Sequence, residues 1–263
     1  MTERGRAALV RDATRLAIGP SALIWDGTVL TIDLAETSAP IPRAVRGRVR
    51  VHPHALVSDT FSLDANARHR WRPIAPRARV EVALSDPALA WSGEGYFDTN
   101  AGTEPLETGF ARWDWSRAHL RHETAILYDG ARRDGSDFGL ALRIDAQGRV
   151  THAEPPPLAA LPRTLWRVER TTRADAGHTP TVRRTFEDSP FYARATLDTH
   201  LFGTPALAVH ETLSLDRFAR PWVKWMLPFR MPRAITTSDS LHLPSNQRLL
   251  RRGPYAIRPP SDS

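Results

Sequence analysis

Cysteine is absent from the 263 residues of the chain. Disulfide bonds, thiolate-ligated zinc and cysteine nucleophiles are therefore excluded. Long apolar runs are absent too, since no stretch approaches the roughly 20 uncharged apolar residues that a membrane-spanning helix needs. The first residues also lack the apolar core of a secretory signal. Together these absences predict a protein that stays in the cytoplasm.

Lysine is nearly absent as well. Of the 36 basic side chains all but Lys224 are arginine, and the formal net charge is +7. The simplest interpretation is an arginine-rich solvated surface. A second interpretation is attraction to an anionic membrane, which is worth about 1 kcal/mol for each basic residue near the lipid. The arginines are scattered rather than grouped with stacking aromatic residues, so nucleic acid is not expected as a partner.

Short runs of strand-like sequence fill most of the chain, with almost no helical periodicity. The segment ALIWDGTVLTIDL predicts a β-hairpin over residues 22–34, with Asp26-Gly27 at the turn. Further strands are expected at 43–51, 77–84, 89–100, 110–120, 125–128, 138–144, 149–154, 164–171, 181–187, 192–201 and 206–215. Many short antiparallel strands predict an all-β fold of the barrel or sandwich type.

A proline-rich segment over residues 155–162 interrupts these strands, because proline cannot sit inside a sheet. It is the best candidate for a domain boundary. We expect a first unit over residues 1–154 and a second over 163–233, with an exchange of strands between them left open. Residues 234–263 are rich in Ser, Pro, Arg and Thr without any period, which predicts a disordered tail.

The most informative stretch is GYFDTNAGTEPLETGFARWDWSRAHL, over residues 95–120. Alternate residues of a strand share a face, so Tyr96, Asp98 and Asn100 are expected to point to one side. Glycines and a proline then mark a turn. The next strand carries Trp113 and Trp115 on a single face, followed in the same alternation by Arg117 and His119. The pattern predicts a carboxylic acid beside aromatic rings.

This stretch resembles the carotenoid 1,2-hydratases (hydroxyneurosporene synthases) of photosynthetic bacteria, where a Y-x-D-x-N-x-G-x-x-P-L element precedes a W-x-W-S-R-A strand. The resemblance extends over residues 1–233 through the segments IGPSALIWDG, PRAVRGRVRVHP, HRWRPIAPRARVEV, LPRTLWRV, DSPFYAR and HETLSLDRFARPWVKWMLPFRMPR. It implies a pair of lipocalin-like β-barrel units. Members of the family carry a further N-terminal region, and MTERGRAALV matches an internal position, so we expect the first barrel to be incomplete.

The resemblance also implies an activity that needs no cofactor. Such an enzyme adds water across the terminal C1–C2 double bond of an acyclic carotenoid such as neurosporene or lycopene. Protonation at C2 leaves a tertiary cation at C1, which water then attacks. The resemblance places the catalytic centre at Asp98, Tyr96, His69 and Trp71.

Each of these residues has an expected role. An alkene is a weak base, so its acid, here Asp98, must be kept un-ionised by an apolar site, whereas a free aspartic acid is ionised at neutral pH. Tyr96 is expected to orient the carboxyl group or the water, and Trp71 to offer its π-face to the cation. His69 is expected to act as the base toward water. Substrate contacts are assigned to Trp113, Trp115 and Asn100, and the remaining histidines show no metal-ligand spacing.

Other interpretations remain open at this point. Asp98 can instead pair with Arg112 or Arg117 near a turn, in a non-catalytic lipocalin-like binder of an apolar ligand. A related polyene cyclase is the other alternative. The aromatic and basic segment at residues 218–233 predicts a final barrel strand or an interfacial membrane anchor. The anchor would place the protein peripherally on the inner or intracytoplasmic membrane.

Overall fold

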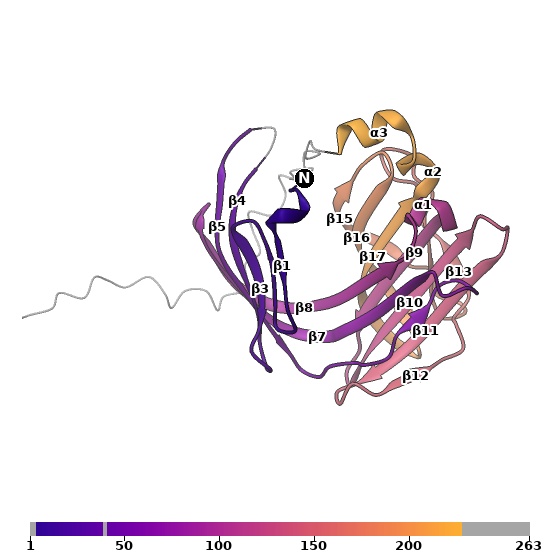
Figure 1. Ribbon diagram of the computed structural model, residues 1–263. Coiled ribbons are helices and arrows are strands. Elements are labelled where there is room, and N and C mark those ends of the chain that lie inside the picture. The colour runs from indigo at the N-terminus through magenta and orange to yellow at the C-terminus, as the bar shows by residue number, and fades with distance from the viewer. Residues whose placement is uncertain (1–3, 39–40, 228–263) are drawn as a thin grey trace, which may run out of the picture. The chain divides into compact units, whose positions relative to one another are not determined.

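The computed structural model describes residues 4–38 and 41–227. Nearly all of its regular structure is β, and every ladder between strands is antiparallel. The prediction of an all-β fold is confirmed. The strands form two large sheets and a small third one (Figure 1).

The first large sheet is built from the N-terminal half of the chain. Its order is β1-β2-β3-β4-β5-β7-β6, with β8 also paired to β7. The strands are β1 (Leu9–Arg11), β2 (Arg15–Ile18), β3 (Ser21–Trp25), β4 (Leu30–Thr37), β5 (Ala44–Pro53), β6 (Phe61–Ser62), β7 (His69–Asp86) and β8 (Leu89–Gly102). The predicted hairpin is confirmed in β3 and β4, where Trp25 pairs with Leu30 and Asp26 Oδ1 accepts hydrogen bonds from the Thr28 and Val29 amides.

The second large sheet has the order β12-β11-β10-β9-β17-β16-β15. Its strands are β9 (Phe110–His119), β10 (Glu123–Arg132), β11 (Asp137–Asp145), β12 (Val150–His152), β15 (Thr181–Asp188), β16 (Tyr192–Leu201) and β17 (Thr204–Ser214). Each sheet ends in an edge strand within the described residues, so these residues form open sheets rather than closed barrels. The family resemblance implied β-barrels, whereas these residues form open sheets.

The proline-rich segment does not separate the two large sheets. β9, which precedes it, pairs with β17, which follows it, and Trp115 lies opposite Glu211. The segment leads into the small sheet of β13 (Leu158–Ala160) and β14 (Thr171–Arg173). Arg173 of β14 forms an ion pair with Asp129 of β10 at 2.7 Å. Residues 155–162 thus begin a strap across the second sheet rather than a linker between sheets.

Strands β7 and β8 connect the two large sheets. They run from the sheet of β1–β5 toward β9 and β10 (Figure 1). The register shifts between Arg72 and Ala75 and again between Ala75 and Ala78, and at each shift β7 carries one residue more than β8. Such bulges bend a strand and increase its twist. They allow the ribbon to leave one sheet and reach the other.

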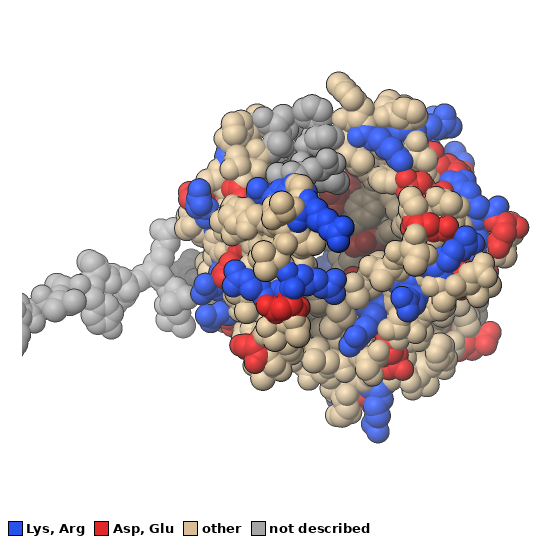
Figure 2. Space-filling view, in the orientation of Figure 1, with Lys and Arg blue, Asp and Glu red and all other residues tan. Residues whose placement is uncertain are grey.

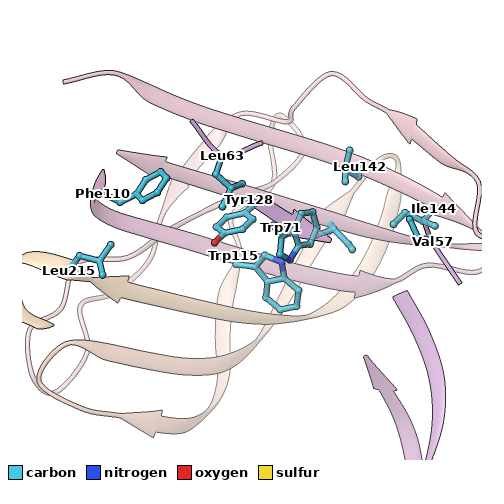
Figure 3. Close-up of a cluster of buried hydrophobic side chains, with 10 residues drawn as sticks. Val57, Leu63, Trp71, Phe110, Trp115, Tyr128, Leu142, Ile144 and Leu215 are labelled. Carbon is cyan, nitrogen blue, oxygen red and sulfur yellow. The ribbon is translucent and has the colours of Figure 1, made fainter. Parts of the chain in front are cut away.

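The two faces of this ribbon pack into different cores. Ala75 and Phe97 pack with the apolar side chains of the first sheet. Trp71, in contrast, belongs to the core of the second sheet with Trp115 and Tyr128 (Figure 3). The ends of β7 and β8 are consequently fixed against the second sheet by apolar burial.

The helices are short: a 3-10 turn (Arg6–Ala8), α1 (Leu106–Gly109), α2 (Leu215–Phe218) and α3 (Pro221–Met226). The prediction of a final strand over residues 218–233 is wrong for the described part of that segment, since Pro221 opens a helix, a position that proline favours. Residues 228–233 and the predicted tail at 234–263 lie outside the described residues. Among the helices that are described, none has the length and apolar character needed to cross a membrane.

Candidate active site

A cavity of about 490 Å³ lies between the ends of β7 and β8 and the inner face of the second sheet. Its lining residues are Trp71, Tyr96, Asp98, Asn100, Trp113, Trp115, Arg117, Tyr128, Arg194, Val209 and Glu211. Figure 2 shows a hollow in the surface over β16 and β17, with Lys and Arg interspersed among Asp and Glu around it. The cavity brings together six of the seven residues that the sequence assigned to catalysis or substrate binding.

The carboxyl group of Asp98 is held through one of its two oxygens. The indole Nε1 of Trp71 donates to Asp98 Oδ2 at 2.7 Å, and the hydroxyl of Tyr96 donates to the same oxygen at 3.0 Å. Oδ1 has no hydrogen-bond partner within the described part of the chain. A carboxyl oxygen with two donors accepts in either protonation state, so a proton on this group belongs on Oδ1.

Aromatic rings surround this carboxyl group. The Tyr96 ring lies 5.0 Å from that of Trp115 at an interplanar angle of 47°. The Tyr128 ring meets Trp71 edge-on at 5.5 Å and Trp113 at 5.9 Å. Such tilted and edge-to-face contacts are the favoured geometries for aromatic pairs. Figure 3 shows Trp71, Trp115 and Tyr128 gathered in one cluster.

Burial controls the protonation of the groups beside Asp98. It raises the pKa of the Tyr96 hydroxyl well above its usual value, and Asp98 raises that pKa further whenever its carboxyl group is ionised. Tyr96 therefore remains a hydrogen-bond donor at physiological pH. The guanidinium of Arg117 lies 5.2 Å from the centroid of the Tyr96 ring, and burial lowers the pKa of this arginine.

His69 is the one predicted site residue that does not line the cavity. Its Nδ1 lies 3.0 Å from Asp64 Oδ2, and its ring packs edge-on against Phe110 at 5.0 Å. A Cβ atom at Gly109 would lie 2.8 Å from His69 Cε1, so only glycine leaves this ring its place. The structure thus locates His69 at the beginning of β7, where it contacts Asp64 and Phe110 and does not contact Asp98.

Four polar residues of the cavity, Arg117, Tyr128, Arg194 and Glu211, were not assigned to the site from the sequence. Tyr128, Glu211 and Arg194 form a row with Trp115 across β10, β9, β17 and β16, because Trp115 pairs with both Tyr128 and Glu211, and Glu211 pairs with Arg194. From the sequence, strand alternation shows only which face of its own strand each residue occupies. The register between strands is needed to show that all of these residues lie on the same face of the sheet.

Across residues 4–38 and 41–227, no group of three or more His, Asp or Glu side chains is arranged to hold a metal ion. The chemistry that the site offers is acid–base chemistry, with a carboxyl group that is held on one oxygen and free on the other.

Two solved structures share the fold at low sequence identity. The putative AttH of Nitrosomonas europaea superposes with a TM-score of 0.52 and 14% identity, covering 80% of this chain and 72% of that one. The structure of CghA with Sch210972 gives a TM-score of 0.51 and 10% identity, with coverage of 78% and 69%. At these identities the likeness concerns the fold alone.

Sequence relatives are much closer. The chain is 56% identical over 234 residues to the acyclic carotenoid 1,2-hydratase of Thiocapsa roseopersicina, and 46% and 42% identical to those of Rubrivivax gelatinosus and Cereibacter sphaeroides. Each alignment covers 89% of this chain, and they cover 58%, 58% and 84% of the three relatives. The chain therefore spans a little over half the length of the first two. Residues 1–239 match the family described as carotenoid hydratase CrtC, and the chain belongs to that family.

Proposed function

We propose that this protein hydrates acyclic carotenoids, adding water across the terminal C1–C2 double bond of a lycopene-type or neurosporene-type polyene. The observation that carries the proposal is the carboxyl group of Asp98, held on Oδ2 by Trp71 and Tyr96 within an aromatic cavity. Membership of the carotenoid hydratase family supports the same class of reaction.

In the proposed reaction Asp98 is the acid. Its Oδ1 proton is transferred to C2, and the electron pair of the double bond forms the new C2–H bond. The resulting cation at C1 is stabilised by the faces of the surrounding rings, an interaction worth about 2 kcal/mol when the site is desolvated. A water oxygen then bonds to C1. No electrons are gained or lost overall, so the reaction calls for no redox cofactor.

The other predicted residues have supporting roles in this proposal. Tyr96 and Trp71 fix the acid, whereas Trp113, Trp115 and Asn100 contact the end of the polyene. His69 stabilises the beginning of β7 through Asp64. The sequence-based role of His69 as the base toward water has no support from its position outside the cavity.

An apolar substrate of this kind resides in the bilayer, so we also propose peripheral contact with an anionic membrane from the cytoplasm. Helix α3 offers a surface for it, since Trp222 and Trp225 are 49% and 75% exposed. Tryptophan favours the headgroup region, and nearby basic residues favour anionic lipid. Arg220 lies directly before this helix.

Expression of the chain in a lycopene-producing host tests the activity. We expect a 1-hydroxy product that gains mass from ¹⁸O-labelled water, and none from the Asp98→Asn variant. A cyclic product of unchanged mass would indicate a cyclase instead. Lycopene that copurifies with the protein unchanged would indicate a binder.

A further inference from the structure

A second carboxyl group lines the same cavity as Asp98. Glu211 lies on β17 of the second sheet, whereas Asp98 lies on β8, and both line the same space. Glu211 Oε1 accepts a hydrogen bond of 2.9 Å from Arg194 Nε. Its side chain is 22% exposed and therefore partly buried. Pairing with arginine holds this carboxyl group in a fixed position.

The phenol of Tyr128 lies near both carboxylates. Its side chain is only 5% exposed and lines the cavity. Burial raises the pKa of its hydroxyl, and the charges of Asp98 and Glu211 raise it further. Tyr128 therefore stays protonated in the cavity that the two carboxyl groups line, and its hydroxyl can both donate and accept a hydrogen bond.

Hydration needs a base as well as an acid, because the water that bonds to C1 must lose a proton. His69 does not line the cavity, and its Nδ1 is engaged with Asp64. Arg117 and Arg194 are cations at physiological pH and accept no proton. Of the described residues that line this cavity, Glu211 is the one carboxylate besides Asp98.

We propose that Glu211 is the general base of the reaction, which rests on the hydratase function proposed above. The C1=C2 electron pair takes the Asp98 proton and forms C2–H. A lone pair of water forms the C1–O bond, one of its O–H bonds breaks, and that proton passes to Glu211. Asp98 is left as a carboxylate and Glu211 as an acid. Water in the cavity, bridged by the Tyr128 hydroxyl, returns the proton to Asp98 for the next turnover.

Deuterium exchange distinguishes the proposed role of Glu211 as the base from that of Asp98 as the acid. The full 263-residue chain is supplied with lycopene in D₂O, and two quantities are followed: the 1-hydroxy product and deuterium at C2 of the recovered lycopene. In Glu211→Gln we expect hydration to fall by about 10²- to 10⁴-fold, the usual worth of general base catalysis. Exchange at C2 continues, because Asp98 still protonates the alkene reversibly. Asp98→Asn should lose both signals.

The matched control is Glu187→Gln. Glu187 Oε2 lies 3.8 Å from the same arginine, Arg194, but Glu187 does not line the cavity. We expect this variant to hydrate lycopene at the wild-type rate. Glu211→Asp retains a carboxylate and should recover part of the activity that Glu211→Gln loses. Thermal unfolding of each variant shows that the fold is retained.

Two results would overturn the proposal for Glu211 alone. Hydration by Glu211→Gln near the wild-type rate would make Asp98 itself the base. Loss of both hydration and exchange in a folded Glu211→Gln would give Glu211 a role in holding the acid. If the wild-type chain neither hydrates nor exchanges, the proposed function fails first, and the role of Glu211 fails with it.

Discussion

The indole of Trp71 donates a 2.7 Å hydrogen bond to Asp98, a residue 27 positions later in the chain. The donor has no exposed surface, because its ring is packed in the core of the second sheet. The position of the carboxyl group is therefore determined by the packing of an entire core rather than by a mobile side chain. This arrangement suits the acid of the proposed reaction, which has to meet one carbon of a long polyene.

Replacing the acid gives the first prediction. Asp98→Asn keeps the size of the side chain and an oxygen that can accept from Trp71 and Tyr96, but it removes the transferable proton. We expect hydration of lycopene to fall by about 10²- to 10⁴-fold, while lycopene still copurifies with the protein. Product chromatography and the absorption of bound lycopene measure the two effects. Turnover close to that of the wild type would place the acid elsewhere.

The second prediction concerns the other donor to Asp98. Tyr96→Phe removes one hydrogen bond to Oδ2 and retains the ring beside Trp115. A loss of about 1–2 kcal/mol, which is about 5- to 30-fold in rate, is expected for such a bond. In the Asp98→Asn background the same change should have no further effect on residual activity. An equal loss in both backgrounds would mean that Tyr96 acts independently of Asp98.

His119 gives a prediction about pH. Burial lowers its pKa to about 4, and the charge of Arg117 contributes in the same direction. The unfolded chain binds a proton near pH 6.5, whereas the folded chain does not until about pH 4, so stability is lost as the pH falls through this window. The slope is up to about 1.4 kcal/mol per pH unit for one such group. Urea unfolding at pH 7 and pH 5 should show a smaller difference for His119→Gln than for the wild type.

The strap over the second sheet provides a prediction about stability. Arg173 and Asp129 are largely buried and form several hydrogen bonds. Arg173→Met leaves the Asp129 charge buried without its partner, for which we expect a loss of about 3–5 kcal/mol. Arg143→Met, which breaks the more exposed pair with Glu123, should cost about 1 kcal/mol or less. Similar losses for the two variants in urea unfolding would contradict the importance of burial.

Membrane contact is tested with the tryptophans of α3. Replacement of Trp222 and Trp225 by serine should reduce flotation with anionic vesicles and leave the melting temperature almost unchanged. Trp91→Ser is the matched control, because Trp91 is as exposed as Trp222 but lies on β8. If Trp91→Ser reduces flotation as much as the double variant, α3 is not the anchor.

Strand alternation and the family resemblance together predicted six residues that the structure brings to one cavity. Alternation placed Tyr96, Asp98 and Asn100 on one face, and all three line the cavity. It could not reveal Glu211 or Arg194, because their approach to Asp98 depends on pairing between strands that are distant in the sequence. Burial patterns describe one strand at a time, whereas the register of a sheet is a property of two.

The bend in β7 was missed for a related reason. Pro73 lies within the first register shift and Pro76 within the second, and proline is tolerated at bulges because it donates no hydrogen bond to a ladder. The run RPIAP at residues 72–76 contained this signal. The prolines alone do not show that the strand bends from one sheet toward the other; the three-dimensional arrangement of the strands shows it.

Phe97 stands between Tyr96 and Asp98 and points away from both, into the core of the first sheet. Three consecutive side chains thus have two different surroundings: Tyr96 and Asp98 line the cavity, and Phe97 packs in the core of the first sheet. A substitution at any of the three changes one of these environments. Random mutagenesis of this triplet should yield few tolerated variants. Phe97 does not line the cavity, yet a change at this position is expected to shift the carboxyl group of Asp98 beside it.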